Sequence, residues 1–429
     1  MDGDNSTESP LFSVVVIAHN VESYIERCMR SVLNQHSEDF ELIVVDDAST
    51  DQTLQRISAI ADGDPRVSVV KKNQNEGAHL ARRTGVAHTV GKFVYFLDGD
   101  DELCPHFFGL SSGLVTSVDA DVYRLGCRVV LESEGEEEHR AIVEHSLNDS
   151  RGRALGEDIL LRSFSDKSAH ADTWRLVSCL YRGEVCRSAF RMMTEDRLGY
   201  MEDAYEFFVV ASCSAVLENA TDLVAQRYNL GSGRSGYSHM SYDEFVKRQS
   251  EVFDLVRSVY SFAEDDGRDV TRRCARWFEG ACLRTISNEW TVRLASETQI
   301  LSVSNLVDTW GHVATLGMLT PPLIGRAQWV LEDDSRLDDA LLASWRSAYA
   351  PLLDSPDIEV EGGEGAVFLL GLLRQIDDHR TARDREVRER LELEMARESV
   401  FPRRVLSALL PRGSKMRRVL SAVARELRS

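Results

Sequence analysis

The beginning of the chain contains four apolar runs, each followed by polar or acidic residues: SVVVIAHN (13–20), ELIVVDDASTD (41–51), VSVVKKNQNEG (67–77) and KFVYFLDGDD (92–101). Short runs of β-branched and aromatic residues without polar alternation are typical of parallel strands that are buried on both faces. Between these runs, apolar residues recur at helical spacing. The pattern therefore predicts a β-α-β-α-β-α-β unit wound into one open sheet.

The pattern changes after residue 101. Residues 121–131 and 139–144 are predicted to form a hairpin around the acidic tip SEGEEE. After residue 241 the apolar spacing is helical almost throughout. We therefore expect a disordered N-terminus over 1–10, an α/β domain over 11–240, a helical C-terminal domain over 241–400 and a basic amphipathic tail over 401–429.

The composition argues against several classes of protein. The 50 Lys and Arg residues against 70 Asp and Glu residues give a net charge of −20, which repels a phosphodiester backbone, so we expect no nucleic-acid partner. The eight cysteines form no C-x-x-C pair and the polar N-terminus has no apolar leader, so we expect a cytoplasmic protein with free thiols. The longest uncharged run, 309–325, is interrupted by two prolines and is too short to span a bilayer.

The tail has the opposite charge to the rest of the chain. Residues 401–429 contain eight Lys or Arg and one Glu, a net charge of +7, and their apolar residues recur at helical spacing. This pattern is typical of an amphipathic helix on an anionic membrane surface, which would place the protein peripherally on the inner face of a membrane. A terminal helix that docks on the acidic surface of the protein itself explains the pattern equally well.

Polar residues gather where the predicted strands end. In an open parallel sheet, ligands bind beyond the carboxyl ends of the strands. Carboxylates clustered at one edge repel one another, so they indicate a site where a cation, hydrogen-bond donors or a ligand offsets the repulsion. The candidates are Ala18, Asn20 and Glu22 after the first strand, Asp46 and Asp47 after the second, Asn75 and Gly77 after the third, and Asp98, Asp100 and Asp101 after the fourth.

The three aspartates after the fourth strand suggest a metal site. Residues two apart at a strand end face the same way, so two carboxylates can converge on one Mg²⁺ or Mn²⁺ ion and leave open positions for diphosphate oxygens. A solvated acidic turn or a helix cap would also explain a bare D-x-D sequence. The capping explanation is the favoured one for Asp51, which precedes the predicted helix at Gln52.

Two further pairs have chemistry suited to a nucleotide. The acceptor oxygens of Asp46 and Asp47 suit the imide or amino edge of a base, or ribose hydroxyls, although turn aspartates would look the same. Arg82 and Arg83 lie in the third predicted helix, where a guanidinium could reach the phosphates. A solvent-facing arginine is the alternative for each, and we expect at most one of them to be functional.

These blocks together resemble the family 2 glycosyltransferases, which have the GT-A fold. The resemblance rests on SVVVIAHNVESYIERCMRSVLNQ, ELIVVDDASTDQT, KNQNEGAHLARRTG and GKFVYFLDGDDEL, in that order, and on the later block YMEDAYEFF with its Glu-Asp motif. It covers roughly residues 11–237. It implies an α/β GT-A fold with an open, mostly parallel sheet, which a mainly α-helical C-terminal domain follows here.

The resemblance also implies a reaction. Family members transfer a sugar from a nucleoside diphosphate sugar, commonly UDP-linked, to an acceptor hydroxyl with inversion, which would suit a glycan or lipid-linked acceptor in cell-surface polysaccharide or glycoconjugate synthesis. A divalent metal, Mn²⁺ or Mg²⁺, would stabilise the departing diphosphate.

The family's functional residues can be carried over by position. Asp203 matches the catalytic base, which takes the acceptor hydroxyl's proton. An acidic pair favoured by the helix macrodipole is the alternative for Glu202 and Asp203. The substrate-binding set would comprise Ala18, Asn20, Glu22, Asp46, Asp47, Asn75, Gly77, Arg82, Asp98 and Glu202, and the metal set Asp98, Asp100 and Asp101.

Several rival functions remain to be weighed. A non-catalytic protein that binds sugar nucleotides, or a scaffold, could use the same fold, since a fold does not ensure catalysis. A Rossmann oxidoreductase fits poorly because HNVESY lacks the G-x-G-x-x-G sequence. A phospho-receiver domain fits poorly because it is shorter and lacks the later acidic blocks. The departures His19, Arg83 and Cys179 from the usual family residues leave the base, the sugar and the acceptor open.

Overall fold

A computed structural model describes residues 9–131, 137–149, 151–165, 174–230, 239–354 and 363–397. The chain divides into two compact units, Met1–Met318 and Leu319–Ser429. The predicted basic tail and most of the predicted N-terminal segment lie outside the described residues. Their disorder and the membrane contact of the tail therefore stay predictions.

The first unit is built on a nine-stranded sheet within the described residues, in the order β3-β2-β1-β4-β8-β6-β9-β5, with β7 beside β9. Its strands are β1 (Phe12–Ala18), β2 (Phe40–Asp46), β3 (Val67–Lys71), β4 (Phe93–Asp98), β5 (Glu102–Leu103), β6 (Val122–Leu131), β7 (Ala154–Leu155), β8 (Cys179–Arg182) and β9 (Val216–Leu230). Its helices up to β9 are α1 (Ile25–Leu33), α2 (Thr53–Ala61), α3 (Ala78–Ala87), α4 (Phe107–Ser117), α5 (Glu137–Asn148), α6 (Glu157–Ser163), α7 (Gly183–Met192) and α8 (Glu202–Cys213).

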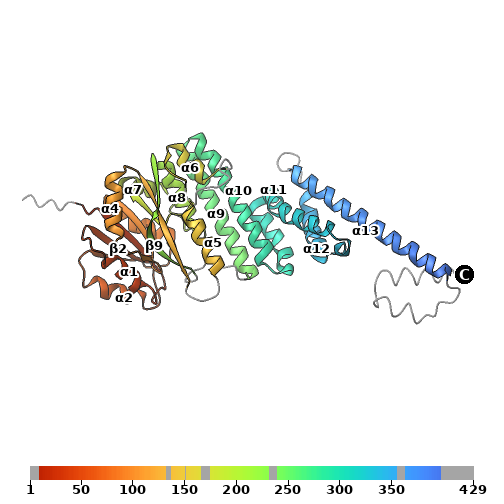
Figure 1. The fold of residues 1–429 in the computed structure, drawn as a ribbon, viewed down its shortest axis with the longest axis horizontal. Coiled ribbons are helices and arrows are strands. Elements are labelled where there is room, and N and C mark those ends of the chain that lie inside the picture. Colours follow the sequence, from red (N-terminus) through yellow and green to blue (C-terminus); the bar gives the residue numbers. More distant parts are fainter. Residues whose placement is uncertain are drawn as a thin grey trace, which may run out of the picture. The chain divides into compact units, whose positions relative to one another are not determined.

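The predicted β-α-β-α-β-α-β unit is confirmed. Strands β1 to β4 are all parallel, with β1 between β2 and β4, and α1, α2 and α3 connect them. Figure 1 labels β2, α1 and α2 of this unit. β1, β2 and β4 are almost wholly buried, as their apolar runs predict. β3 differs from the prediction: it lies at the edge of the sheet and is partly exposed, because only β2 pairs with it.

Helices cover both faces of this sheet. On one face, Met29 of α1, Ile57 of α2 and Phe108 of α4 belong to the same buried cluster as Phe12 and Val14 of β1. On the other face α3 packs against β1 and β2, and α7 and α8 pack on α3. The strands alternate their side chains between the two faces, so both helical layers contact the same four strands.

The predicted hairpin after residue 121 is wrong. Residues 122–131 form the strand β6, but α5 occupies the place of the expected second strand. Arg140 of α5 contacts Glu137 and Glu144 at helical spacing, which favours a helix. The backbone N–H groups of Cys127 and Val129 donate to the side chains of Asn148 and Glu144, so α5 satisfies the β6 edge that a partner strand would have paired.

The helical character expected after residue 241 is confirmed, and the first unit continues into it. Ser241 caps the N-terminus of α9 (Tyr242–Asp266), because its hydroxyl accepts a hydrogen bond from the backbone N–H of Glu244. α9 packs against α10 (Asp269–Arg293). α11 (Ser296–Leu331) is interrupted at Gly311. Since the compact unit extends to Met318, a domain boundary at residue 240 remains a prediction.

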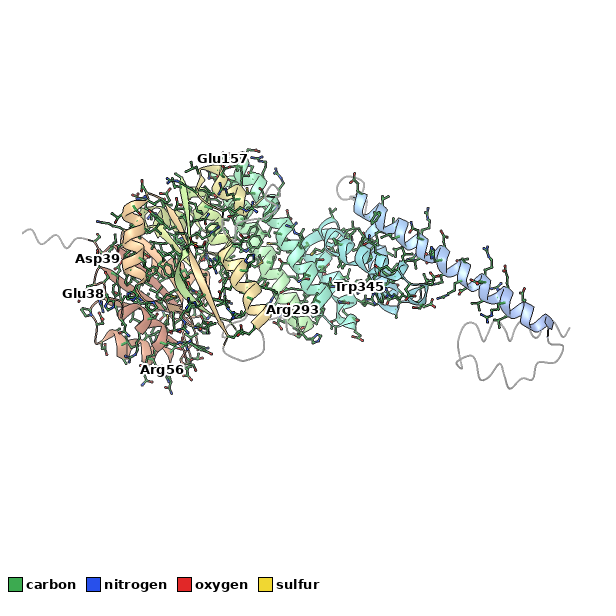
Figure 2. All side chains as sticks on the ribbon, in the orientation of Figure 1. Glu38, Asp39, Arg56, Glu157, Arg293 and Trp345 are labelled. Atoms are coloured by element: carbon green, nitrogen blue, oxygen red, sulfur yellow. The ribbon has the colours of Figure 1, made fainter. Side chains whose placement is uncertain are left out.

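The second unit contains the remaining helices, α12 (Ala340–Tyr349) and α13 (Gly363–Arg397), with short 3₁₀ turns at Asp334–Arg336 and Ala350–Asp354. Trp345, labelled in Figure 2, lies on α12 and is buried. Arg346 binds both carboxylate oxygens of Asp377 on α13. In the described part of the chain, no helix combines the length and the apolar character that a membrane crossing requires.

A substitution of Gly85 in α3 tests how closely this helix approaches the sheet. A Cβ atom at Gly85 would lie 2.4 Å from Cγ1 of Val15 and 3.3 Å from Cγ2 of Val45. We expect Gly85→Ala to lower the free energy of unfolding by about 1–3 kcal/mol through overpacking, measured by urea denaturation. Gly113→Ala in α4 is the control: nothing lies within 4 Å of its Cβ position, so it should leave stability unchanged or raise it slightly. An equal loss in both variants would contradict the close approach.

Candidate active site

The register of the central strands brings the predicted residues to one edge. Ala18 at the end of β1 pairs with Asp46 at the end of β2, and Ile17 pairs with Asp98 at the end of β4. The loops that follow these strands therefore leave the sheet side by side. This is the arrangement that the sequence predicts for the residues after the first, second and fourth strands.

Asp46 has a buried carboxylate that is only partly satisfied. Its side chain is fully buried, and Oδ2 accepts a hydrogen bond from the backbone N–H of Ser49 at 3.3 Å. Its Oδ1 atom is buried and has no hydrogen-bond partner among the described residues. A buried acceptor without a donor is costly, so this oxygen is a position where a ligand N–H or hydroxyl would be stabilised.

The carboxylate of Asp47, the neighbouring aspartate, instead accepts hydrogen bonds from backbone N–H groups. Its two carboxylate oxygens accept hydrogen bonds from the N–H groups of Glu76 and Gly77, at 3.0 and 2.8 Å. Gly77 has a φ of 87°, a conformation that favours glycine, and it immediately precedes α3. Asn75 in the same loop accepts a hydrogen bond from Arg197. Asp47 therefore fixes the loop between β3 and α3.

The loop after β1 is tied to the loop after β2. Asn20 has a φ of 54°, and its Oδ1 accepts a hydrogen bond from the backbone N–H of Thr50 at 2.8 Å. Oε2 of Glu22 accepts one from the N–H of Gln52 at 2.8 Å. Asp51 accepts a hydrogen bond from the N–H of Thr53 at the start of α2, as its expected capping role requires. Asn20 and Glu22 thus shape this edge.

Asp101 anchors the long strand β9. Its Oδ2 accepts a hydrogen bond from Nε2 of Gln226 at 2.6 Å, and its Oδ1 accepts one from the backbone N–H of Asn229 at 2.8 Å. Tyr95 and Ser178 donate to the other side-chain atom of Gln226, Oε1, and so fix its orientation. Burial, together with the charges of Asp98 and Asp100, raises the pKa of Asp101 to about 8.

Arg82 joins three elements around its buried guanidinium. Its Nη2 donates to Asp98 of β4 at 3.1 Å, and its Nη1 donates to Glu206 at 3.0 Å and to Glu202 at 3.4 Å, both on α8. We call Asp98, Glu202, Asp203 and Glu206 the acidic cluster. Burial by itself would lower the pKa of Arg82, but these carboxylates outweigh it and raise the pKa well above its usual value.

The Glu-Asp pair begins α8. Met201, just before the helix, has a φ of 57°, and Glu202 and Asp203 lie in the first turn. Burial and the charge of Glu202 raise the pKa of Asp203 to about 7, although Arg82 opposes the shift. Burial also raises the pKa of Glu202, against the effect of Arg82. Asp203 is therefore a carboxyl group that changes its protonation near neutral pH, which suits proton transfer.

Two residues of this site were not singled out from the sequence: Glu206 and His79. Glu206 is fully buried and binds both Arg82 and Nδ1 of His79, the latter at 2.9 Å. The other ring nitrogen of His79 faces the carbonyl oxygen of Thr194 at 3.0 Å. The available signal was helical spacing, since Glu206 lies four residues after Glu202 and His79 three before Arg82, in otherwise apolar faces.

Arg83 has a separate role from Arg82. Its Nη1 donates to the backbone oxygen of Met193, and its Nη2 to Glu195 at 2.8 Å. It therefore holds the segment that precedes α8, whereas Arg82 lies inside the acidic cluster. Of the two arginines that the sequence offered, the structure brings Arg82 to the predicted site.

The side chains that could bind a metal are not gathered around one position in the described part of the chain. Among the described residues, no group of three or more His, Cys, Asp or Glu side chains is arranged to hold an ion. Asp98 is one-third exposed and Arg82 contacts one of its oxygens, while both oxygens of Asp101 are bonded to β9. A Mg²⁺ ion commonly takes only one or two protein carboxylates and completes its shell with substrate phosphates and water, and the partly exposed carboxylate of Asp98 fits such an ion.

Glu206 provides a test of the buried network. Glu206→Gln removes the charge that faces Arg82 and His79, and we expect it to lower the free energy of unfolding by about 3–5 kcal/mol, measured by urea denaturation. The control is Glu195→Gln, which alters an 84% exposed partner of Arg83 and should cost less than about 1 kcal/mol. Similar losses in the two variants would show that the buried contacts are no stronger than a surface pair.

Comparison with known proteins identifies the first part of the chain. Residues 13–162 match the family model described as glycosyl transferase family 2. The putative teichuronic acid biosynthesis glycosyltransferase TuaG of Bacillus subtilis is 40% identical over 93 residues, which are 22% of this chain and 37% of TuaG. The uncharacterized glycosyltransferase EpsJ of the same organism is 28% identical over 195 residues, 46% of this chain and 54% of EpsJ.

Similarity also extends to solved structures. A crystal structure of S. aureus TarS aligns with a TM-score of 0.53 at 16% identity, covering 80% of this chain and 89% of that one. This similarity confirms the expected GT-A fold. The aligned residues cover only about a third of TuaG and about half of EpsJ. The match of the family model nevertheless spans β1 to β4 and the acidic residues after them, and this chain therefore carries a glycosyl transferase family 2 domain over residues 13–162.

Proposed function

We propose that this protein is an inverting glycosyltransferase that moves a sugar from a nucleoside diphosphate sugar to an acceptor hydroxyl. The observation that carries the proposal is the acidic cluster: Arg82 links Asp98, at the carboxyl end of β4, to Glu202, the neighbour of Asp203. Residues for the donor and a candidate base thus belong to one connected group, although they lie far apart in the sequence.

The donor is proposed to be a UDP-sugar. The unpartnered Oδ1 of Asp46 suits an imide N–H of a base or a ribose hydroxyl. S. aureus TarS, which shares the fold, has been crystallised with UDP and with UDP-GlcNAc. TuaG is named as a putative glycosyltransferase of teichuronic acid biosynthesis. This name supports a role of this chain in the synthesis of a cell-surface polysaccharide.

Asp203 is proposed to be the base. In its ionised form it accepts the proton of the acceptor hydroxyl while that oxygen attacks the anomeric carbon. The attack comes from the side opposite the departing diphosphate, so the configuration at this carbon inverts. Arg82 holds Glu202 and therefore the first turn of α8, which fixes where Asp203 lies relative to β4.

Asp98 and Asp100 are the proposed ligands of a divalent metal, Mn²⁺ or Mg²⁺. When bound, this ion would neutralise charge that develops on the diphosphate. Asp101 is less suited, because burial keeps its pKa near 8 and its oxygens hold β9. Asp47 is similarly occupied by the backbone, so Asp46 is the aspartate proposed to contact the nucleoside.

The role of Asp203 predicts both a loss of activity and a pH profile. Asp203→Asn should lower kcat about 10²–10⁴-fold while UDP binding stays within about twofold. In the wild type, kcat/KM should fall as the pH drops below about 7, because protonation of Asp203 removes the base; the profile is measured as UDP release in the presence of acceptor.

A matched control is Asp196→Asn, an exposed carboxylate in the segment before α8, which should keep wild-type activity and the same acidic limb. Wild-type activity in Asp203→Asn would remove Asp203 as the base. Binding of UDP without transfer by the wild type, across a panel of nucleotide sugars and acceptors, would instead favour the non-catalytic binding protein.

The metal assignment predicts a difference in ligand stabilisation. A ligand of the folded state raises the melting temperature by mass action, so UDP with Mn²⁺ should stabilise the wild type more than UDP alone. Asp100→Ala should abolish that metal-dependent increment, whereas Asp222→Ala, at an exposed position on β9, should retain it. An unchanged increment in Asp100→Ala would contradict its role as a ligand.

A further inference from the structure

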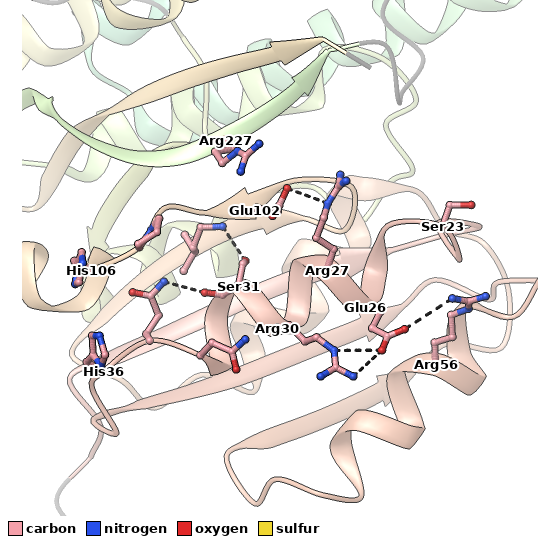
Figure 3. A pocket seen from close by; sticks show the side chains of 14 residues that line it. Ser23, Glu26, Arg27, Arg30, Ser31, His36, Arg56, Glu102, His106 and Arg227 are labelled. Atoms are coloured by element: carbon pink, nitrogen blue, oxygen red, sulfur yellow. Dashed lines mark hydrogen bonds and ion pairs between the residues drawn. The ribbon is translucent and has the colours of Figure 1, made fainter. Parts of the chain in front are cut away.

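A cavity of about 580 Å³ lies along α1, bordered also by α2, β5 and β9 (Figure 3). None of the residues proposed to bind the donor or the metal lines it, so it is separate from the acidic cluster. Its lining begins at Ser23, directly after Glu22 in the loop at the carboxyl edge of the sheet. We call this cavity the α1 groove.

The α1 groove carries a surplus of positive charge. Four guanidinium groups line it, from Arg27, Arg30, Arg56 and Arg227, and they are accompanied by two carboxylates. Figure 3 shows these arginines contributed by α1, α2 and β9. The surplus contrasts with the net charge of −20 on the whole chain. A local concentration of positive charge attracts anions to this surface.

The two carboxylates hold the arginines without saturating them. Glu102 contacts Nε of Arg27 at 2.9 Å, and Glu26 contacts Arg30 at 2.7 Å and Arg56 at 3.9 Å. Each guanidinium has five N–H donors, so most donors remain for a ligand. The side chains of Arg27, Arg30 and Arg56 are 47, 60 and 41% exposed, which leaves them accessible.

Further donors lie on other sides of the groove. Arg227 is exposed and makes no ion pair within the part of the chain that the structure describes. The rings of His36 and His106 are stacked with their centroids 5.5 Å apart, and both residues are exposed. An imidazole N–H can donate to an anionic oxygen. The hydrogen-bond donors therefore lie on several sides of the groove and are not confined to one position.

The frame of the α1 groove is rigidly connected. The backbone N–H of Leu103 donates to Oγ of Ser31 at 2.9 Å, and Nε2 of Gln35 donates to the backbone oxygen of Cys104 at 3.0 Å. These bonds attach β5 and the residue that follows it to α1 and the residues at its end. Oε1 of Gln35 is buried and has no partner among the described residues. A groove that is largely preformed binds with a smaller ordering cost.

We propose that the α1 groove binds an acceptor glycan chain that carries carboxylate or phosphate groups. The lining positions extend from Glu26 near the start of α1 to Asn34 directly after its end, roughly 12 Å along the helix direction, which is too long for one small ion. Ser23 and Asn34 add neutral groups suited to sugar hydroxyls. This inference rests on the proposed function, because it assigns the groove to the acceptor of that reaction.

The lining favours a glycan over a nucleic acid. Proteins that bind single-stranded nucleic acids combine positive charge with aromatic side chains on which the bases stack. The described residues that line the α1 groove include no Phe, Tyr or Trp. A charged sugar polymer needs hydrogen-bond donors and cations but no stacking platform.

The test uses the full chain and fluorescent probes of defined chemistry. The probes are an oligogalacturonate, an oligo(glycerol phosphate), a neutral dextran oligomer and a single-stranded oligodeoxynucleotide of matched charge. We expect the two anionic glycan-type probes to bind, with affinity that falls as salt is added, and dextran not to bind. The tighter of the two shows whether carboxylate or phosphate is the natural group.

The groove variant is Arg27→Gln, Arg30→Gln and Arg227→Gln combined, and it should bind the anionic probe at least tenfold more weakly. The control variant combines Arg153→Gln, Arg272→Gln and Arg273→Gln, which are 48, 40 and 46% exposed, are also ion-paired and lie outside the groove. It should bind within twofold of the wild type. If the combined groove variant melts early, Arg227→Gln alone should still weaken binding about threefold or more.

Three results would overturn the inference: equal affinities of the groove and control variants, equal binding of dextran, or tighter binding of the oligodeoxynucleotide through the same arginines. Stabilisation of the wild type by UDP and Mn²⁺, measured in parallel, reports on the proposed function separately. Loss of that stabilisation with intact polyanion binding would refute the donor site. Stabilisation by UDP and Mn²⁺ without polyanion binding would refute only the proposed binding of an anionic glycan in the α1 groove.

Discussion

The guanidinium of Arg82 is the contact on which the site depends. It is only 4% exposed, and a buried charge is tolerated only where opposite charges and hydrogen bonds replace water. Here Asp98, Glu202 and Glu206 supply them from two elements, β4 and α8. The same contacts offset the electrostatic repulsion between these carboxylates, so the carboxylates can lie close together. Arg82 therefore fixes α8 against the sheet and sets the electrostatics around Asp203.

Neighbouring aspartates of this protein differ because their surroundings differ. Asp46 keeps a buried oxygen without a partner, whereas Asp47 accepts two backbone N–H groups. Asp101 holds β9, and its pKa is raised by burial, whereas Asp98 is partly exposed and contacts Arg82. Identical side chains therefore divide between those whose oxygens hold the backbone, Asp47 and Asp101, and those that keep an unpartnered or partly exposed oxygen, Asp46 and Asp98. The division follows from which donors each loop presents to them.

The first unit contains two regions of opposite charge. In the acidic cluster, several carboxylates surround the guanidinium of Arg82, an arrangement that suits a cation and a proton transfer. Along α1, guanidinium groups outnumber carboxylates, an arrangement that suits an anionic chain. The loop of Asn20 and Glu22 precedes the first lining residue of the α1 groove. A donor and a charged acceptor would thus meet surfaces of opposite sign.

The sequence alone determined the four parallel strands, their three helices and the edge at which the candidate site residues gather, because continuous apolar runs and helical spacing are local signals. It also pointed to Arg82, Asp98 and Asp203 as site candidates. Only the tertiary structure decided that Asp47 and Asp101 are bound internally, that α5 replaces a predicted strand, and that Glu206 and His79 complete the buried network. These outcomes depend on contacts between residues distant in the chain, which no local spacing encodes.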